Sequence, residues 1–441
     1  MSFTIQRAEL AEDLLRNLIA GLPVIDIHTH ISPLQPGARN LGEVVFYHYV
    51  LTELRTAGLD TAAFEKAPLE HWLRLLEQWH PCVANTSTWW CLRQIMELLG
   101  AKGFSRRELN EADAKLQSRG SDSGWVRQVL VDCCHIQKTL VTLNITEPLP
   151  SFDEELFAGA LRVDEAVVGL SAATARAISS TANLGCGDLH DYEEATATLV
   201  EAFANSGGRT VTIGLPPDAG YSAPGKTLAA KFYSDVLSGG VLTGADRTAF
   251  HSYLLRHFAT LARELRLPFQ MLAGVRRPLP GGVALPVVEA ELIARYAGLF
   301  HEFSSVHFDL FLASAAASQE LVAAARNYPN VNVSGHWWFA FSPPHIRGML
   351  LERLYALPVS KVHAFFSDAY NVEWSYGKIM LYKRELAHVL AEMISGGYLA
   401  ESQAESVARQ ILYDNPKRFY RLAEKAPVLL DASRRRMPPC F

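Results

Sequence analysis

Eight short apolar runs recur along the chain, and most of them end in polar residues or glycine. The segments between them, such as 191–208 and 251–267, carry apolar residues every three or four positions, which is the helical repeat. Strands that alternate with helices favour parallel βαβ units, and eight such units favour a closed (β/α)8 TIM barrel. The runs lie at residues 24–28, 139–145, 161–168, 209–215, 268–274, 306–313, 331–335 and 361–367.

The interval between the first run and the second is far longer than one loop. Its sequence is helical in pattern and contains no low-complexity linker. We therefore expect a helical insertion after strand one, over about residues 40–125, that sits above the mouth of the barrel. The whole chain, residues 1–441, is then expected to form a single domain.

Composition narrows the class of protein. The formal net charge is −5 and the acidic residues are scattered, which excludes the electrostatic pattern of a protein that binds nucleic acid or an anionic membrane. The six cysteines form no CxxC pair, which favours a reducing compartment. The chain lacks a signal-peptide pattern and any apolar stretch of transmembrane length. We expect a cytoplasmic protein with a small-molecule partner, and a homo-oligomer is left open.

His28 and His30 stand two residues apart at the end of the first run. In a regular strand both rings point to one face, with Asp26 beneath them, and in a barrel this is the inner face at the catalytic end. Two imidazoles on one face can bind a divalent ion, and zinc is the expected one. The alternative is that the two histidines are ordinary polar residues at a strand end. Their position between an apolar strand and a polar loop supports the metal site as strongly as this alternative.

Asp368 follows the last run, on the strand that neighbours strand one when a barrel closes. Its carboxylate could complete a His–His–Asp ligand set and accept a proton. The alternative is that Asp368 caps the next helix, because the segment 367–374 resembles a capped helix start. With two histidines expected on the neighbouring strand, we favour the ligand.

His336, at the end of the seventh run, is either a further ligand or substrate contact, or a residue that hydrogen-bonds beside two tryptophans. Trp337 is expected in the core or in a pocket wall. His307 and His363 begin their strands, at the end of a barrel that serves stability, and are expected to be structural.

These motifs together resemble the amidohydrolase superfamily and, within it, the uronate isomerase (glucuronate isomerase) family, of which the chain looks like a divergent member. The resemblance is carried by His28 and His30 on strand one, Asp368 on strand eight and the terminal motif NPKRFY at 415–420. It extends over most of the chain, including the helical insertion. The other resembling segments are 26–33, 40–59, 161–165, 335–339 and 365–369.

The resemblance implies specific roles. A divalent metal ion is implied on His28, His30 and Asp368. A catalytic tyrosine is implied at Tyr49, in the pair His48–Tyr49, with Asp368 as the second proton-transfer group. The remaining positions, expected to contact substrate, are His48, Arg162, Arg276 or Arg277, His336, Trp337 and Tyr370.

The chain also departs from the family pattern. Leu272 stands nearest to the histidine expected on strand five, and Tyr370 stands where an arginine is expected after Asp368. The acidic residue expected after strand four is missing, with Asp218 a few residues beyond. Because arginine suits carboxylate binding, the change at Tyr370 removes one anchor for a sugar acid.

Three functions stay open on the sequence. The leading one is a metal-assisted aldose–ketose isomerase of the uronate type, in which Arg162 holds the substrate carboxylate. In this function a positive neighbour is expected to lower the pKa of Tyr49. The second is a metal-dependent hydrolase, which the retained His–His–Asp set allows and the lost strand-five histidine disfavours. The third is a non-catalytic barrel that binds a sugar acid.

Overall fold

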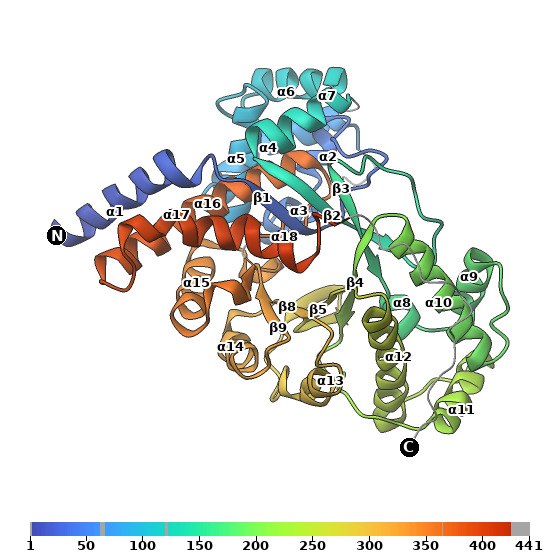
Figure 1. Cartoon of the computed structure of the whole chain (residues 1–441). Coiled ribbons are helices and arrows are strands. Elements are labelled where there is room, and N and C mark those ends of the chain that lie inside the picture. The colour runs from blue at the N-terminus through green and yellow to red at the C-terminus, as the bar shows by residue number, and fades with distance from the viewer. Residues whose placement is uncertain (1, 62–66, 120–121, 364, 425–441) are drawn as a thin grey trace.

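The computed structural model describes residues 2–61, 67–119, 122–363 and 365–424. Its central feature is an eight-stranded parallel sheet in the order β1-β2-β3-β4-β5-β8-β9-β10 (Figure 1). Seven consecutive parallel pairings follow the chain order, as in a barrel. The strands are β1 (Val24–Thr29), β2 (Ile136–Asn144), β3 (Phe157–Arg162), β4 (Gly208–Leu215), β5 (Phe269–Ala273), β8 (Phe308–Leu312), β9 (Val331–Ser334) and β10 (Val362–His363).

The gap between the last strand and the first is bridged just beyond β10. The backbone N–H of Asp368 donates to the carbonyl of His28 (3.1 Å), and the N–H of His30 donates to the carbonyl of Ala369 (2.8 Å). In the described residues no strand ladder joins β10 to β1, so these two bonds bring the end of the sheet back to its beginning. The predicted (β/α)8 fold is confirmed.

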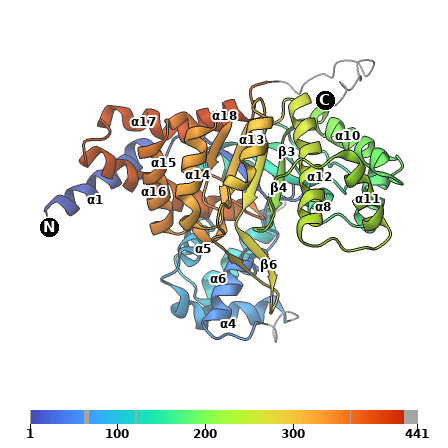
Figure 2. The ribbon, with the colours of Figure 1, turned by 90° about the horizontal axis from the view of Figure 1, so that it is seen from below.

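Helices surround the sheet on its outer side (Figures 1 and 2). The longest helix, α16, packs its buried face against the amino-terminal helix and against the insertion. The helices outside the insertion are α1 (Ser2–Leu14), α8 (Asp164–Val167), α9 (Ala172–Ala182), α10 (Leu189–Asn205), α11 (Lys226–Leu237), α12 (Gly244–Glu264), α13 (Ala297–Glu302), α14 (Ser318–Asn327), α15 (Pro343–Ala356), α16 (Val372–Ser395), α17 (Glu401–Arg409) and α18 (Asn415–Phe419).

The segment between β1 and β2 is helical in its described part and gathers at one end of the molecule (Figure 1). Side chains of Asn40, Thr86 and Asp122 accept hydrogen bonds from the first turns of three of its helices, so local capping sets their starts. That the whole chain is one domain stays a prediction. The helices of this insertion are α2 (Leu41–Val45), α3 (His48–Thr56), α4 (Leu69–Val83), α5 (Ser87–Leu98), α6 (Arg106–Arg119) and α7 (Ser123–Arg127).

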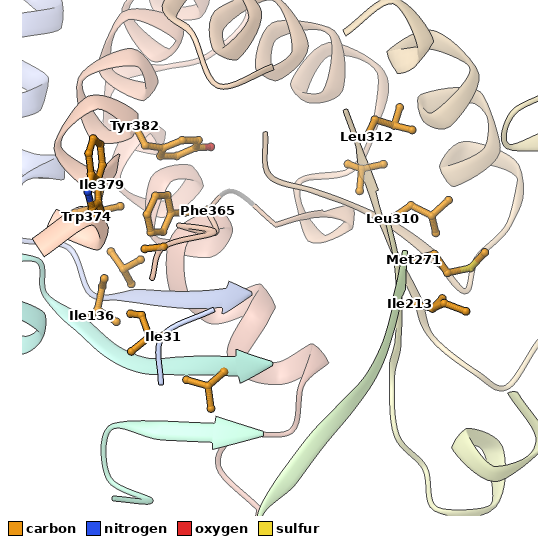
Figure 3. Packing of buried hydrophobic residues seen from close by; sticks show 14 of the residues in the cluster. Ile31, Ile136, Ile213, Met271, Leu310, Leu312, Phe365, Trp374, Ile379 and Tyr382 are labelled. Carbon is orange, nitrogen blue, oxygen red and sulfur yellow. The ribbon is translucent and has the colours of Figure 1, made fainter. Parts of the chain in front are cut away.

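Two apolar clusters lie on the two faces of the sheet. The larger fills the space between sheet and helices; in Figure 3, Ile213, Met271 and Leu310 lie on successive strands and Trp374, Ile379 and Tyr382 come from α16. The smaller lies inside the barrel. Alternation along β5 and β8 separates the two, because Met271 and Leu310 face outward while Leu272 and Phe311 face inward.

The third and the eighth predicted strands differ most from the structure. The third begins earlier, at Phe157, and ends at Arg162, because Asp164–Val167 forms a helical turn in place of the predicted strand end. The eighth is shorter than predicted, with only Val362–His363 in the ladder. A two-stranded hairpin, β6 (Val275–Leu279) and β7 (Val283–Pro286), follows β5 and was not predicted. Among the described residues, no helix is both long enough and apolar enough to cross a membrane.

Candidate active site

One large pocket, with a volume of about 1140 Å³, opens at the carboxyl ends of the barrel strands. Strand ends supply His28, His30, Arg162 and Leu272, and the insertion supplies a wall that includes Tyr47, His48 and Tyr49. Most of the residues predicted from the sequence to form a site therefore line one cavity.

Strand β1 is irregular where it carries the two histidines. Its register against β2 shifts between Asp26 and Thr29. Ile25 and Ile27 belong to the inner cluster, and yet the ring of His28 also lies inside, with its centroid 5.9 Å from the ring of Phe311. A strict two-residue alternation therefore fails here.

This irregularity separates Asp26 from the histidines. Asp26 does not line the pocket, and its carboxylate accepts a hydrogen bond from the backbone N–H of Ser367 (2.8 Å). Burial raises the pKa of Asp26 to about 7, against the opposing effect of its bonds to Ser367. The prediction that Asp26 lies beneath His28 and His30 on one face is wrong, because the bulge interrupts the alternation.

His28, His30 and Asp368 each offer a ligand atom, and these atoms lie within 4.8 Å of one another. His30 Nε2 lies 3.2 Å from Asp368 Oδ1. Two ligands held at about 2.1 Å from one zinc ion in a tetrahedral site lie roughly 3.4 Å apart, so this spacing fits a shared ion.

The proton position on His30 gives a second test of that fit. Thr142 Oγ1 donates its hydrogen to the carbonyl of Thr29 (2.9 Å), so it must accept from His30 Nδ1 (3.0 Å). When the ring of His30 is neutral, the lone pair of its Nε2 faces the carboxylate of Asp368. Two lone pairs facing each other need a cation between them, either a proton or a metal ion, and the donor set of two imidazoles and a carboxylate suits a divalent ion.

Asp368 has a strained backbone conformation. Its φ of +49° lies in the left-handed region, where aspartate is tolerated better than most residues. Burial alone would raise the pKa of Asp368, but the hydrogen bond and charge of His30 and the charge of Lys378 outweigh it and lower the pKa. The helix-cap alternative does not apply, because Asn371 is the residue that caps α16.

Tyr49 points at the same carboxylate. Its hydroxyl donates to Asp368 Oδ2 (3.2 Å), while the neighbouring Tyr47 donates to the carbonyl oxygen of Asp368 (3.0 Å). Burial and the charge of Asp368 raise the pKa of Tyr49 well above 10. The groups of the protein thus act opposite to the lowering of this pKa that the sequence predicted, because the nearest charge is negative.

The arginines differ in their partners. Arg162 lines the pocket and also forms an ion pair with Asp164 (3.0 Å). Arg276 pairs with Glu289 and does not line the pocket. Arg277 lines the pocket and forms no ion pair with the acidic residues that the structure describes.

The other predicted residues divide into two groups. His48, Trp337 and Tyr370 line the pocket, and the ring of Tyr370 stacks on His30 at 5.2 Å. His336 is buried and lies outside the pocket lining, and neither of its ring nitrogens has a hydrogen-bond partner among the described residues. Burial lowers the pKa of His336 well below its usual value.

Leu272 lines the pocket where the family pattern has a histidine, so the ligand set lacks a contribution from strand five. Asp218 forms an ion pair with Arg247 and does not line the pocket either.

Two residues near the site were not predicted. Lys378 of α16 is buried and donates to the hydroxyl of Tyr47 (2.8 Å) and to the carbonyl of Ser367 (2.6 Å). Burial lowers the pKa of Lys378 to about 8, although Asp368 opposes this.

Gln270 lies beside His28, with its Oε1 3.1 Å from His28 Nδ1. The signal for Gln270 was present, since it is the one polar residue among the apolar residues of β5.

Comparison with known proteins points to one group. No protein-family model matches the chain. A uronate isomerase from Thermotoga neapolitana is 21% identical over 212 residues, which cover 44% of this chain and 46% of that protein. The chain thus spans about half the length of this curated relative.

Solved structures extend the likeness to nearly the whole chain. A uronate isomerase from Thermotoga maritima superposes with a TM-score of 0.84 at 17% identity, covering 93% of this chain and 97% of the other. A glucuronate isomerase from Caulobacter crescentus gives a TM-score of 0.83 at 17% identity, with 94% of each chain covered. The predicted resemblance to uronate isomerases is confirmed, and the fold is the one these proteins share.

Proposed function

We propose that this protein catalyses the aldose–ketose isomerisation of a sugar acid of the glucuronate or galacturonate type, assisted by a divalent metal ion, for which zinc is the candidate. One observation carries the proposal: a single pocket is lined by a His–His–Asp group, a tyrosine bonded to that aspartate, and two arginines. The likeness to uronate isomerases supports the same reaction.

His28, His30 and Asp368 would hold the ion, which would polarise a substrate oxygen when bound. The open side of this group faces the pocket, where a sugar can approach. Because strand five contributes Leu272, the protein would supply three ligands, His28, His30 and Asp368.

Arg277 is the best candidate for binding the substrate carboxylate. Its guanidinium has no competing carboxylate among the described residues, whereas the charge of Arg162 is shared with Asp164. A guanidinium binds a carboxylate through two parallel hydrogen bonds, which fixes the orientation of the sugar. Arg162 then contributes a second positive group. His48, Trp337 and Tyr370 form the adjacent walls.

Tyr49 and Asp368 are the proton-transfer groups. Isomerisation moves a proton from one carbon of the sugar to its neighbour, and the hydroxyl proton moves from one of their two oxygens to the other. Asp368 is the acceptor of the existing Tyr49 hydrogen bond, so it is the group poised to take a proton. Tyr49 keeps its own proton at neutral pH and returns it to substrate, and the proton on Asp368 passes along the same hydrogen bond to restore the tyrosine.

Incubation of the purified protein with glucuronate and with galacturonate, followed by detection of ketose, tests this function. The expected result is ketose formation that falls to background in a His28→Ala/His30→Ala double variant, together with a fall in bound metal. Hydrolysis of a lactone without ketose formation would support the hydrolase alternative. Binding of the sugar acid with neither product would support the non-catalytic alternative.

A further inference from the structure

Gln270 occupies a fully buried position between His28 and the carboxyl-terminal motif. Its Nε2 donates to the carbonyl of Ile27 (2.8 Å) and to the hydroxyl of Tyr420 (2.9 Å), and its Oε1 lies 3.1 Å from His28 Nδ1. All the polar atoms of this carboxamide are therefore used.

These contacts determine which nitrogen of His28 carries the hydrogen. A backbone carbonyl can only accept, so the side facing Ile27 must be the amide nitrogen of Gln270. The opposite side is then its oxygen, which also can only accept. His28 Nδ1 must donate to it, which leaves the lone pair of a neutral His28 on Nε2.

The chain of hydrogen bonds continues to a buried carboxylate. Tyr420 accepts from Gln270 and donates to Asp309 Oδ2. Asp309, which is fully buried, also accepts from Ser334 Oγ (2.6 Å) and lies 3.0 Å from His363 Nδ1. The bonds from His28 to Gln270, from Gln270 to Tyr420 and from Tyr420 to Asp309 run in one direction, and aligned hydrogen bonds of this kind polarise one another in a low-dielectric interior.

We propose that Gln270 and Tyr420 are positioning residues that hold His28 in the Nδ1–H tautomer, with its Nε2 turned to the metal site, through a hydrogen-bond chain anchored on Asp309. The proposal gives a structural role to the motif at 415–420, because its Tyr420 lies in the barrel interior and completes the series of hydrogen bonds. The value of this tautomer to the enzyme rests on the proposed function, whereas its existence can be measured without metal.

The first measurement is the tautomer itself in the metal-free protein. Long-range ¹H–¹⁵N spectra of histidine-labelled protein distinguish a protonated ring nitrogen from an unprotonated one, and a His28→Gln variant identifies the signals. We expect His28 with hydrogen on Nδ1. In Gln270→Leu, which removes the acceptor, we expect this preference to be lost. A wild-type His28 with hydrogen on Nε2 would overturn the proposal without any variant.

The second measurement is affinity for Zn²⁺ alone, by competition with a chelator. Outer partners of ligating histidines are worth about 10–100-fold in metal affinity, so Gln270→Leu should weaken binding by that factor. Tyr420→Phe keeps the contact between Gln270 and His28, so it should weaken Zn²⁺ binding less, by a few-fold. The matched control is Tyr382→Phe, since the buried hydroxyl of Tyr382 has no hydrogen-bond partner in the described structure; its affinity should equal that of the wild type.

The outcomes separate this proposal from the proposed function. A wild type that shows the Nδ1–H tautomer but binds no Zn²⁺ would reject the metal site and keep the positioning network. Wild-type Zn²⁺ affinity in a folded Gln270→Leu variant would reject the positioning role and leave the metal site standing. Circular dichroism of each variant establishes folding, and the wild-type tautomer decides the matter if Gln270→Leu does not fold.

Discussion

Two sets of the same three residue types occupy different depths of this barrel. At the mouth, His30 lies 3.2 Å from Asp368, which also accepts from Tyr49. Deeper inside, His363 lies 3.0 Å from Asp309, which also accepts from Tyr420. The side chains of the His–Asp pair are 21% and 12% exposed at the mouth but 1% and 0% exposed in the interior.

The difference lies in what surrounds each carboxylate. Asp309 is enclosed and accepts a further bond from Ser334, so its oxygens are saturated by protein donors. Asp368 faces a large pocket and has a second histidine, His28, within ligand distance. The interior set is enclosed and bonded to protein groups, whereas the set at the mouth faces a pocket that a ligand could enter, as the proposed function requires.

The largest expected effect is on stability at the interior set. Asp309→Asn replaces one acceptor oxygen with an amide group that cannot accept a hydrogen bond, and leaving a buried donor unsatisfied in this way costs about 1–3 kcal/mol for each donor. Asp368→Asn, at the more exposed set, should cost less than Asp309→Asn while abolishing ketose formation. Urea unfolding of both variants measures the free energies, and equal losses would remove the distinction between the two sets.

The next effect is on catalysis at the mouth. Tyr49→Phe keeps the ring and removes the hydroxyl that donates to Asp368. We expect kcat to fall by at least ~100-fold, the low end for general acid–base catalysis, with the fold intact. Steady-state kinetics on the better of the two sugar acids measures it. A rate near that of the wild type would make the mouth set structural, like the interior one.

A smaller effect is expected from the arginines around the mouth. Arg277→Lys loses bidentate carboxylate binding and should raise KM about 10-fold for a sugar acid, with little change for its neutral analogue. Arg276→Lys is the matched control, because Arg276 pairs with Glu289 outside the pocket. Arg162→Lys should give an intermediate increase. If Arg276→Lys raised KM as much as Arg277→Lys, the assignment of the anchor would be wrong.

The smallest effect concerns a buried histidine that belongs to neither set. His336 has no hydrogen-bond partner for either ring nitrogen among the described residues. An apolar replacement removes unpaired polar atoms, so His336→Leu should change the free energy of unfolding by no more than ~1 kcal/mol in either direction. His363→Leu, which takes a donor from Asp309, should cost ~1–3 kcal/mol. A cost for His336→Leu as large as that for His363→Leu would contradict this contrast.

Local patterns were enough to predict much of the site. The spacing of His28 and His30 at a strand end, and Asp368 on the strand expected beside it, predicted a convergence that the structure contains. The reason is that parallel strands in a barrel end at one rim, so residues after different strands meet whatever lies between them in the sequence.

Other features depended on contacts between distant segments. Asp26 lies away from the face of the histidines because the register of β1 shifts. The pKa of Tyr49 is raised because the folded chain buries its hydroxyl and places it beside Asp368, far away in the sequence. Arg276 and Arg277 are adjacent in the sequence, and only the position of Glu289 and of the pocket distinguishes them.

The sequence by itself determined the alternation of strands and helices, the helical insertion after β1 and the residue types at the strand ends, since these follow from periodicity and local capping. Tertiary structure alone decided which histidine–aspartate pair is enclosed by hydrogen bonds from the protein and which one faces the pocket. Hydrogen-bond partners such as Gln270, Tyr420 and Lys378 come from segments far from the residues they bind, and no local pattern specifies that pairing. Protonation and charge depend on those partners and on burial, so the chemistry of each histidine and aspartate was settled only when the barrel brought the segments together.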